Sequence, residues 1–595
     1  MLEEPIILAL WESKGNIRRD PGFVLSDINT SCERAFGVAG RADIARSLHV
    51  EEANAHLAGT VWRIIAELEK LNVVNGSFDH DYLGQLYETF FRYTGGNTIG
   101  QYFTPRHITR FMADLVQVTM NSVVFDPACG TGGFLIAALQ RCHDTSGLSY
   151  QQTVEAVRER LIGYESEPIT AALCIANMIV RGDGKTGIRK DNCFTAADYP
   201  YSECDFVLMN PPFPHKKTDT PPQEFIQRAL DALRTQGKLG VIVPTSFVAK
   251  KEYQDWRKYI LKNNTLTSVV QLPDELFQPF ASATTSIITL EKGIPHDPKR
   301  KTTFVRIEHD GLTLKKGIRL PRLDGLNDIP EALDAILNKK SKPGYSGTAS
   351  VHPGDEWSPG AYIPSAVYTV EELKGSIDIL LRRLASFYVR YAMEISTQRK
   401  KIENRELIPL PYRKIAGKKR NDNASKLPSI AGTIGERFDI FYGQKELHSR
   451  EGYSPGDTLI VSPTEEYNGC YGWLDYQNLI QAPFVTVAQT GTIGEAFVQC
   501  EPCGVNDDCL ILLPKDGSAC SLSTLVIIAA IIRSEKWRFS YGRKLTPARI
   551  ASFPMTNSVE LDQWVAIELG KWMELAENAV KVYRQPADVT VNVGY

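Results

Sequence analysis

The segment Val123-Val-Phe-Asp-Pro-Ala-Cys-Gly-Thr-Gly-Gly-Phe134 decides which fold we expect for this chain. It starts as an apolar strand that ends in Asp126, continues as a glycine-rich turn, and enters the sequence FLIAALQRC, which is typical of a buried helix. Gly130, Gly132 and Gly133 allow a tight backbone and leave room for a ligand to approach closely. A strand, a glycine turn and a helix in this order predict the nucleotide-binding turn of an open α/β sheet.

Six more apolar runs follow this turn and alternate with amphipathic sequence. Their length and composition predict buried strands at LIGYE (161–165), GIRK (187–190), DFVLMN (205–210), KLGVIVP (238–244), LTSVVQL (266–272) and SIITLEK (286–292). Alternation of strands and helices predicts a doubly wound, Rossmann-like α/β sheet over residues 121–292.

Polar side chains stand at the ends of three successive predicted strands. Glu165 ends its strand one βα unit after the glycine turn, where a carboxylate can accept hydrogen bonds from both ribose hydroxyls of an adenosine. Asp191 and Asn192 follow the next strand, where an acid or amide can meet the adenine amino group of a cofactor. These positions predict a ligand that contains a nucleoside.

The strand at 205–210 leads directly into Asn210-Pro211-Pro212-Phe213. Exocyclic amines of nucleobases are poor nucleophiles because their lone pair is delocalised into the ring. The Asn210 side-chain oxygen and the Pro211 carbonyl can each accept one N–H of such an amine, which favours a tetrahedral nitrogen. Two prolines hold the carbonyl rigidly, and Phe213 offers a flat face for a base that has left the stack. We therefore expect Asn210, Pro211, Pro212 and Phe213 to be catalytic.

Asp126–Phe134 and Asn210–Phe213 resemble motifs I and IV of the amino-methyltransferases that modify DNA, in their gamma order. Residues 86–93 (LYETFFRY) and 100–107 (GQYFTPRH) resemble the modification subunits of type I restriction-modification systems more narrowly. The resemblance extends over about residues 50–292. It implies transfer of a methyl group from S-adenosylmethionine to adenine N6, with residues 101–106 covering the methionine part of the cofactor. Cys129 within the turn departs from the pattern, and we interpret it as a packing residue.

The implied cofactor site combines that segment, the glycine turn and the strand ends. Its predicted members are Gln101, Tyr102, Phe103, Thr104, Pro105, Arg106, Asp126, Ala128, Gly130, Thr131, Gly132, Gly133, Phe134, Glu165, Asp191, Asn192 and Asn210.

The C-terminal half carries a second resemblance. Residues 456–462 (GDTLIVS), 485–494 (VTVAQTGTIG) and 539–546 (FSYGRKLT) look like the target-recognition domain of type I specificity subunits and of fused single-chain enzymes. Helical periodicity at 368–405 and 559–584 predicts long helices on either side of a β-rich segment at 430–555. We expect a helical N-terminal domain at 1–98, a methyltransferase domain at 99–292, a connecting region at 293–360 and a target-recognition domain at 361–595.

Nucleic-acid binding must rest on local basic surfaces, because the formal net charge of the 595-residue chain is only -3. Two clusters are candidates for contacts with DNA phosphates, and the second is interleaved with Trp537, Phe539 and Tyr541. The candidates are Arg413, Lys414, Lys418, Lys419 and Arg420, followed by Arg538, Arg543 and Lys544.

The eleven cysteines are scattered, and the N-terminal sequence lacks the features of a secretory signal. These observations predict a cytoplasmic protein without disulfides, and no apolar run is long enough for a membrane span. Cys500 and Cys503 form one CxxC pair, with Cys509 and Cys520 beyond it. We interpret them as buried thiols and expect no metal site.

Other activities share parts of this pattern. Methyltransferases of a protein glutamine amide or of RNA bases use the same amide chemistry, but they would not need residues 360–595. Cytosine N4 poses the same chemical problem as adenine N6, although its enzymes more often have Ser in place of Asn210. A specificity protein with an inactive methyltransferase half is a third alternative. We expect double-stranded DNA as the partner and a monomer rather than a homodimer. No nuclease or helicase motif is apparent, so we expect cleavage only through a separate restriction nuclease subunit.

Overall fold

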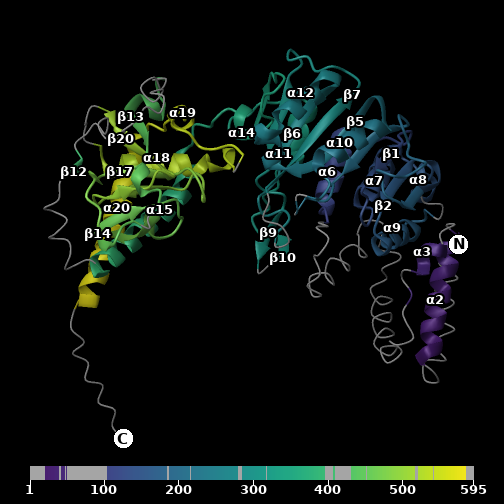
Figure 1. Ribbon diagram of the computed structural model, residues 1–595, viewed down its shortest axis with the longest axis horizontal. Coiled ribbons are helices and arrows are strands. Elements are labelled where there is room, and N and C mark those ends of the chain that lie inside the picture. The colour runs from purple at the N-terminus through teal and green to yellow at the C-terminus, as the bar shows by residue number, and fades with distance from the viewer. Residues whose placement is uncertain are drawn as a thin grey trace, which may run out of the picture. The chain divides into compact units, whose positions relative to one another are not determined.

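The computed structural model in Figure 1 divides into two compact units, Met1–Ile363 and Pro364–Tyr595, which are described separately. Within the N-terminal region that we expected to be helical, the structure describes α2 (Pro21–Val38) and α3 (Ala42–Ala45), while most of residues 46–102 lie outside the described part. The described residues are 21–38, 42–46, 49, 103–183, 187–214, 216, 218–278, 284–315, 318–394, 407–408, 430–449, 452–515, 520–540 and 542–584.

A nine-stranded sheet forms the centre of the first unit, with strand order β11-β8-β6-β7-β5-β4-β1-β2-β3. All seven strands predicted from the apolar runs are present, and two later ones join them. The strands are β1 (Val124–Asp126), β2 (Leu161–Glu165), β3 (Gly187–Lys190), β4 (Cys204–Met209), β5 (Leu233–Pro244), β6 (Asn264–Gln271), β7 (Thr285–Lys292), β8 (Thr302–Arg306) and β11 (Ser346–Ala349).

The strand order confirms the doubly wound α/β fold. Strand β1 pairs in parallel with β2 on one side and with β4 on the other, β2 pairs with β3, and β4 pairs with β5, all in parallel. The order therefore reverses at β1, and such a switch point leaves a crevice at the carboxyl ends of the strands. The side chains that follow β1, β2, β3 and β4 consequently meet at one edge of the sheet.

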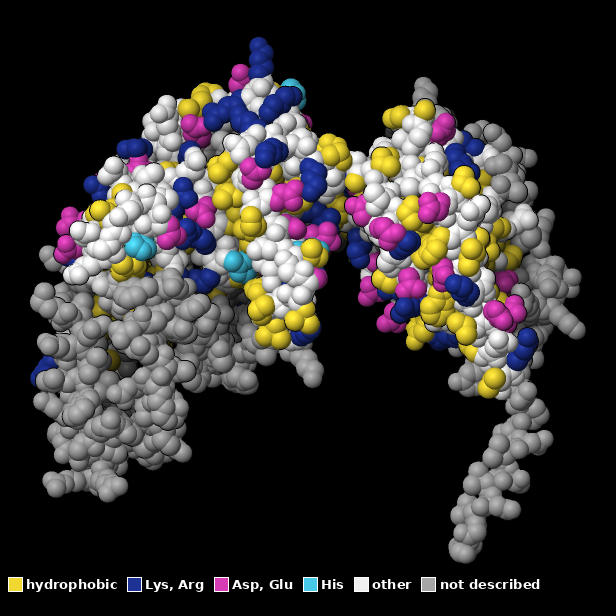
Figure 2. Space-filling model, turned by 180° about the vertical axis from the view of Figure 1, so that it is seen from behind, with side chains coloured by type: hydrophobic (Ala, Val, Ile, Leu, Met, Phe, Trp, Pro, Cys, Tyr) yellow, Lys and Arg dark blue, Asp and Glu magenta, His cyan; other side chains and the backbone are white. Residues whose placement is uncertain are grey.

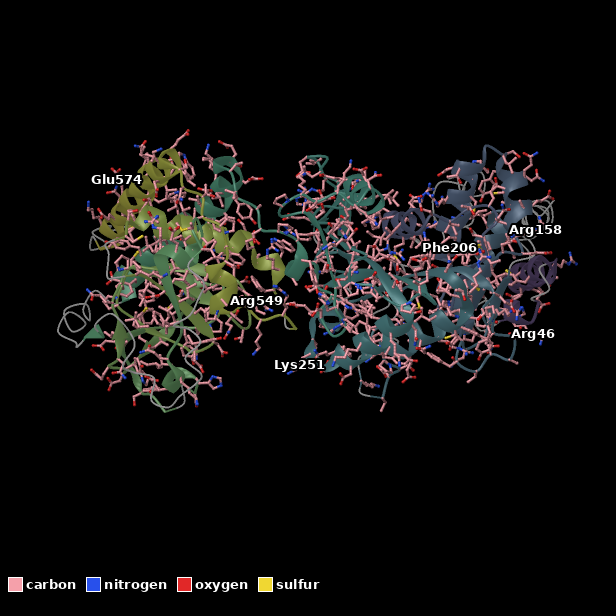
Figure 3. The ribbon with its side chains drawn as sticks, turned by 90° about the horizontal axis from the view of Figure 1, so that it is seen from above. Arg46, Arg158, Phe206, Lys251, Arg549 and Glu574 are labelled. Atoms are coloured by element: carbon pink, nitrogen blue, oxygen red, sulfur yellow. The ribbon has the colours of Figure 1, made fainter. Side chains whose placement is uncertain are left out.

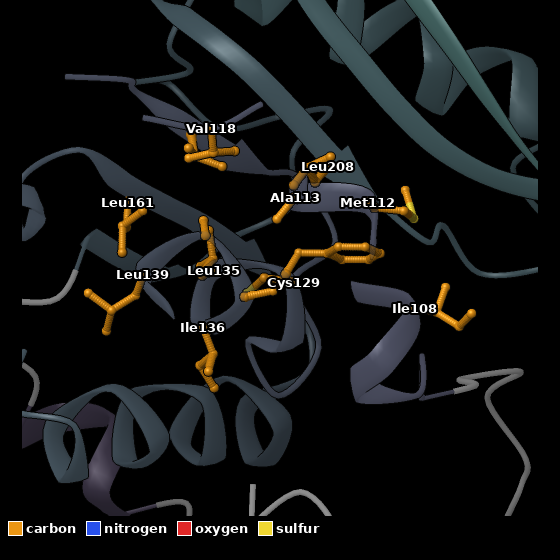
Figure 4. Packing of buried hydrophobic residues seen from close by; sticks show 14 of the residues in the cluster. Ile108, Met112, Ala113, Val118, Cys129, Leu135, Ile136, Leu139, Leu161 and Leu208 are labelled. Carbon is orange, nitrogen blue, oxygen red and sulfur yellow. The ribbon is translucent and has the colours of Figure 1, made fainter. Parts of the chain in front are cut away.

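Helices pack against the sheet and bury their apolar sides on it (Figure 1). Figure 4 shows Ile108 and Met112 of one helix and Leu135, Ile136 and Leu139 of another within a single hydrophobic core. Besides α2 and α3, the described α-helices of this unit are α6 (Arg106–Val116), α7 (Gly133–Ser146), α8 (Tyr150–Val157), α9 (Pro168–Val180), α10 (Pro222–Ala232), α11 (Thr245–Ala249), α12 (Gln254–Asn263), α13 (Ile329–Leu337) and α14 (Pro359–Tyr362).

Residues 293–360, which we expected to be a connecting region, contribute to the fold of the first unit. Strand β8 pairs in parallel with β6, and β11 pairs antiparallel with β8, so both extend the central sheet. Between them lies an antiparallel hairpin of β9 (Leu312–Lys315) and β10 (Ile318–Pro321). The expectation was wrong because β8 and β11 are short and rich in Thr, Ser and Gly, which gives them no strong apolar pattern.

The second unit is built on two small sheets, as its β-rich sequence predicted. One has the order β13-β20-β17-β18 and the other β15-β14-β19, and β12 and β16 form a separate two-stranded sheet. The strands are β12 (Leu407–Ile408), β13 (Phe438–Tyr442), β14 (Pro455–Val461), β15 (Cys470–Leu474), β16 (Leu479–Ile480), β17 (Phe484–Ala488), β18 (Ala496–Gln499), β19 (Gly504–Val505) and β20 (Cys509–Pro514).

Two long helices, α15 (Val370–Glu394) and α20 (Val559–Arg584), pack against each other within this unit and against the apolar helix α18 (Leu522–Ser534). Leu373, Ile377 and Leu380 of α15 are buried in the same core as Leu561 and Val565 of α20. Glu574 of α20 is exposed to solvent (Figure 3). Of the predicted helix 368–405, residues 395–405 lie outside the described part. Two short helices complete the unit, α17 (Ile434–Arg437) and α19 (Pro547–Ala551).

Among the described residues, none of the helices combines the length and the apolar composition that a membrane span requires.

Candidate active site

The glycine-rich turn leaves β1 at the crevice and enters α7. Gly130 has φ +54°, and a Cβ placed there would meet no atom within 4 Å, so the turn borders open space at this point. Gly132 has φ +89°, and a Cβ there would lie 2.9 Å from the Cys174 sulfur, so close packing on α9 also requires glycine. Asn177 of α9 donates a hydrogen bond to the Thr131 carbonyl at 2.9 Å. The turn therefore packs on α9 at Thr131 and Gly132 and faces open space at Gly130.

Glu165 lies at the end of β2, directly beside this turn. Its buried carboxylate accepts hydrogen bonds from the Gly130 N–H at 3.1 Å and from the Glu167 N–H at 2.8 Å. Burial raises the pKa of Glu165 above its ordinary value, against the opposing effect of these backbone donors. A ligand whose hydroxyl groups donate to this carboxylate would favour its charged form.

Asp126 is a second buried carboxylate at the same edge. One of its oxygens accepts a hydrogen bond from the Ala128 N–H at 3.1 Å, while the other meets no donor among the described residues. Burial and the nearby charge of Glu165 raise the pKa of Asp126 well above its ordinary value. Two buried acceptors next to an open glycine turn fit a ligand that is rich in hydrogen-bond donors.

The predicted adenine-side residues occupy the turn after β3. Asp191 receives the Asn192 N–H on its carboxylate at 2.7 Å, and the Asn192 side chain receives the Phe194 N–H at 2.9 Å. The Asp191 N–H donates to the Glu165 carbonyl at 3.0 Å, which attaches this turn to the end of β2. Both predicted residues therefore shape a turn that adjoins Glu165.

Asn210 follows β4 at the same edge and contacts the segment that precedes α6. Its side-chain amide donates a hydrogen bond to the Thr104 hydroxyl at 3.1 Å, across 106 positions of the chain. Because the NH₂ group faces Thr104, the amide is oriented with its oxygen as the group that can accept from an amine. The structure thus brings together one residue of the predicted catalytic motif and one of the predicted cofactor segment.

The rest of the catalytic motif and the cofactor segment are arranged around this contact. Pro211 is buried and Pro212 exposed. Phe213 is largely buried and packs edge-to-face on Phe277, with ring centroids 6.1 Å apart. The half-buried residues Phe103, Thr104, Pro105 and Arg106 belong to the described part, whereas Gln101 and Tyr102 lie outside it.

Sequence reasoning missed residues after β6 and β8 that adjoin this edge. Phe277 is the packing partner of Phe213, and Asp310 accepts a hydrogen bond from the ring of His107 at 2.8 Å. Asp310 also forms an ion pair with Arg319 at 2.6 Å. Burial opposes the charged form of Asp310, but the hydrogen bond from His107 and the charges of His107 and Arg319 hold its pKa below the ordinary value. These residues lie in segments without a recognisable motif.

In the second unit, the predicted phosphate contacts of Arg538 and Arg543 do not agree with the structure. Both side chains are buried: Arg538 forms an ion pair with Glu535, and Arg543 donates a hydrogen bond to the Arg538 carbonyl at 3.0 Å. Trp537 and Phe539 are also buried, so the interleaving of basic and aromatic residues reflects internal packing. Lys544 is exposed. The other cluster, Arg413, Lys414, Lys418, Lys419 and Arg420, lies outside the described residues.

The four C-terminal cysteines do not come together as metal ligands among the described residues. Cys503 and Cys509 are buried and Cys500 is exposed. The interpretation as buried thiols is confirmed for Cys503 and Cys509, whereas it is wrong for the exposed Cys500, and Cys520 is half-buried.

Comparison with known proteins identifies the part of the chain that carries this site. Residues 78–353 match the family model of the N-6 DNA methylases. The type II restriction enzyme and methyltransferase RM.BcgI of Heyndrickxia coagulans is 34% identical over 290 residues, which cover 47% of this chain and 45% of the relative. The EcoEI methylase subunit of a type I restriction enzyme from Escherichia coli is 29% identical, with coverage of 40% and 52%. This chain therefore spans about half the length of these curated relatives.

Solved structures of related proteins show weaker similarity. The modification subunit of a type I restriction enzyme from Vibrio vulnificus YJ016 has a TM-score of 0.36 and 21% identity, with 49% of this chain and 65% of that chain covered. The type I methyltransferase subunit from Streptococcus thermophilus has a TM-score of 0.44 and 18% identity, with coverage of 58% and 76%. Residues 78–353, which match the N-6 DNA methylase family model, include the crevice described above.

Proposed function

We propose that this protein is a DNA methyltransferase that transfers a methyl group from S-adenosylmethionine to adenine N6, and that its second unit selects the DNA sequence. The observation that carries the proposal is the hydrogen bond between Asn210 and Thr104. This hydrogen bond connects the motif 210–213, which we expect to bind the target amine, with the segment 101–106, which the family resemblance predicts to cover the cofactor. The relatives named above, a methyltransferase and a methylase subunit, support methyl transfer, and the match to the N-6 DNA methylase family model supports DNA as the acceptor.

The cofactor side of the crevice consists of the glycine turn, Asp126 and Glu165. Glu165 would accept hydrogen bonds from the ribose hydroxyls, and the open side of Gly130 allows the ligand to approach the backbone. When bound, S-adenosylmethionine supplies an electrophilic methyl group attached to a positively charged sulfur. The turn after β3, with Asp191 and Asn192, would border the adenine of the cofactor.

The target side consists of Asn210 and the backbone that follows it. The Asn210 side-chain oxygen and the Pro211 carbonyl would each accept one N–H of the exocyclic amine, so that its lone pair is withdrawn from the ring and directed at the methyl group. Since Thr104 already holds the amide, little reorganisation is needed at the moment of reaction. The nitrogen gains a bond to the methyl carbon as the carbon–sulfur bond breaks and leaves its electron pair on the sulfur, and the nitrogen then releases one proton to water.

We also propose that the second unit acts as the target-recognition domain. Helices α15 and α20 pack on each other and share one buried core within a single chain, which supports a monomer for this unit, while Ile567, Leu575 and Val582 of α20 are exposed. A partner nuclease subunit would be required for any cleavage.

The experiment that tests the proposal is long-read sequencing of DNA from cells that express the chain, scored for modified bases. We expect methylated adenine at one sequence motif, and no methylation in cells that express Asn210→Ala. Methylated cytosine would assign the chemistry to cytosine N4. Unmodified DNA, despite S-adenosylmethionine binding by the purified protein, would refute DNA methylation.

A further inference from the structure

The hairpin β9–β10 projects from the first unit beside α6 (Figure 1). Its strands pair in antiparallel register from Leu312 with Pro321 to Lys315 with Ile318. At its base, the Arg322 N–H donates to the Gly311 carbonyl at 2.9 Å, and Asp310 forms a β-bridge with Asn327. The segment 310–327 is therefore one closed structural element.

Two contacts attach this hairpin to the edge of the sheet where Asn210 lies. On one side, Asp310 accepts a hydrogen bond from His107, which lies three positions after Thr104, the partner of Asn210. On the other side, Arg319 lies 3.6 Å from the Glu275 carboxylate, in the same turn as Phe277, which packs on Phe213. The hairpin is thus linked to both segments that frame Asn210.

The surface of this element is unusually apolar. Leu323 is 96% exposed, Leu320 44% and Leu326 47%, and Pro321 is also exposed. Figure 2 shows hydrophobic side chains gathered over the projecting hairpin. Single exposed leucines are common, but three within seven residues on a projecting element indicate a surface that contacts another molecule.

Charge and position indicate which molecule that is. Residues 310–327 contain four basic and two acidic residues, so the element carries a net charge of +2. Arg319 and Arg322 form ion pairs with Asp310 and Asp324, whereas Lys315 is exposed next to the apolar surface. A polyanion is the complementary partner. An enzyme that modifies a base of duplex DNA must also take that base out of the stack, and apolar side chains commonly fill the opened step. A basic, leucine-bearing hairpin fastened to the catalytic edge meets both requirements.

We propose that the β9–β10 hairpin contacts the DNA duplex beside the target base, with Leu320 and Leu323 against the opened base step and Lys315 near the phosphates. This inference rests on the proposed DNA methyltransferase activity. Within it, the second unit selects the sequence, and the hairpin stabilises the duplex from which the base has been removed.

The test measures DNA affinity with two hairpin variants of the full-length chain, Leu323→Asp and Lys315→Glu. Leu337→Asp and Lys339→Glu are matched controls, because both residues are exposed at or just after the end of α13 in the same unit. The probe is a fluorescein-labelled duplex that carries the methylated motif, in the presence of S-adenosylhomocysteine. Thermal unfolding and S-adenosylmethionine affinity are measured for each variant.

We expect each hairpin variant to raise the dissociation constant for the duplex at least fivefold, while the controls change it less than twofold. For Lys315→Glu the slope of log Kd against log salt should fall by about one. All four variants should keep the unfolding temperature and the cofactor affinity of the wild type. A 2-aminopurine at the target position should become less fluorescent with Leu323→Asp, because the opened state is populated less.

Three results would decide against parts of this reasoning. If the wild type methylates DNA and both hairpin variants bind the duplex like their controls, the hairpin inference is wrong and the proposed function stands. Hairpin variants that keep DNA affinity but change the sedimentation coefficient of the free protein would assign the surface to protein association, which also overturns the inference. A wild type that neither methylates nor binds DNA would refute the proposed function itself.

Discussion

The hydrogen bond from Asn210 to Thr104 allows a quantitative test of how the target side of the site is organised. Replacing Thr104 with Val removes the hydroxyl that accepts from the Asn210 amide at 3.1 Å and preserves the shape of the side chain. A hydrogen bond between neutral groups contributes about 0.5–1.5 kcal/mol net. If that energy serves to orient Asn210 in the transition state, the rate of methyl transfer should fall roughly two- to twelvefold, at ~1.4 kcal/mol per factor of ten.

The assay is single-turnover transfer of a tritiated methyl group to a duplex, with enzyme and cofactor both saturating. Thr104→Ser keeps a hydroxyl and should restore most of the rate. Thr109→Val is the matched control on the following helix, because the Thr109 hydroxyl donates to the Arg106 carbonyl and does not contact Asn210. Its rate of methyl transfer should stay within about twofold of the wild type, since exchanges away from a reacting group leave transition-state contacts intact.

A double-mutant cycle decides whether Thr104 acts through Asn210. Asn210→Ala should slow transfer by about 10²- to 10³-fold, the range for loss of one preorganised group in an active site. If Thr104 only orients Asn210, Thr104→Val should have no further effect in the Asn210→Ala background. An equal loss of rate in both backgrounds would refute the positioning role and would indicate that Thr104 acts independently on cofactor or substrate.

Three further predictions concern the cofactor side and the second unit. Glu165→Gln should weaken S-adenosylmethionine binding by about 1–3 kcal/mol in calorimetry, and unchanged affinity would remove Glu165 from the site. Because burial raises the Glu165 pKa, the affinity of the wild type for S-adenosylmethionine should decline as the pH falls through that raised pKa, while the affinity of Glu165→Gln should not change with pH. In the free protein, the contribution of Glu165 to folding stability should be lost as the pH rises through the same raised pKa. Gly132→Ala should lower the free energy of unfolding by about 1–3 kcal/mol, since it combines φ +89° with a contact to Cys174, and a denaturation midpoint equal to that of the wild type would contradict this. Exchange of residues 430–555 for the matching segment of a relative with another specificity should move methylation to that relative's motif, and a chimera that keeps the original motif would show that DNA is read elsewhere.

The sheet was predictable because its strands are local patterns. Each apolar run that ends in a polar residue could be recognised within about seven positions, and the glycine turn at 130–133 set the class of fold. The strands of 293–360 could not be found in the same way. Strand β8 joins the sheet through its pairing with β6, and that pairing depends on tertiary context rather than on an apolar period.

The contacts that organise the site were not predictable from local sequence. His107 and Asp310 are separated by 203 positions, and no sequence motif contains both residues or predicts their contact. The opposite error occurred at Arg538, where basic and aromatic residues in one short run resembled a nucleic-acid surface. In the structure, Trp537 is buried and Arg538 forms an ion pair with Glu535, so this run packs inside the second unit. Only the three-dimensional structure distinguishes such internal packing from a surface that binds nucleic acid.

The sheet order explains why the predicted cofactor motif and the predicted catalytic motif lie at one edge of the sheet although 84 positions separate Asp126 from Asn210. Strand β1 is the only neighbour that β2 and β4 share in the described sheet, so Asp126 lies between the Glu165 side and the Asn210 side. Parallel pairing brings the three carboxyl ends to one edge, and the reversal of strand order at β1 separates the two flanking helices there. A methyl donor held on the β2 side and an amine held on the β4 side would therefore face each other across β1. Thr104 reaches Asn210 at that edge because α6 packs on α7, the helix that follows the glycine turn.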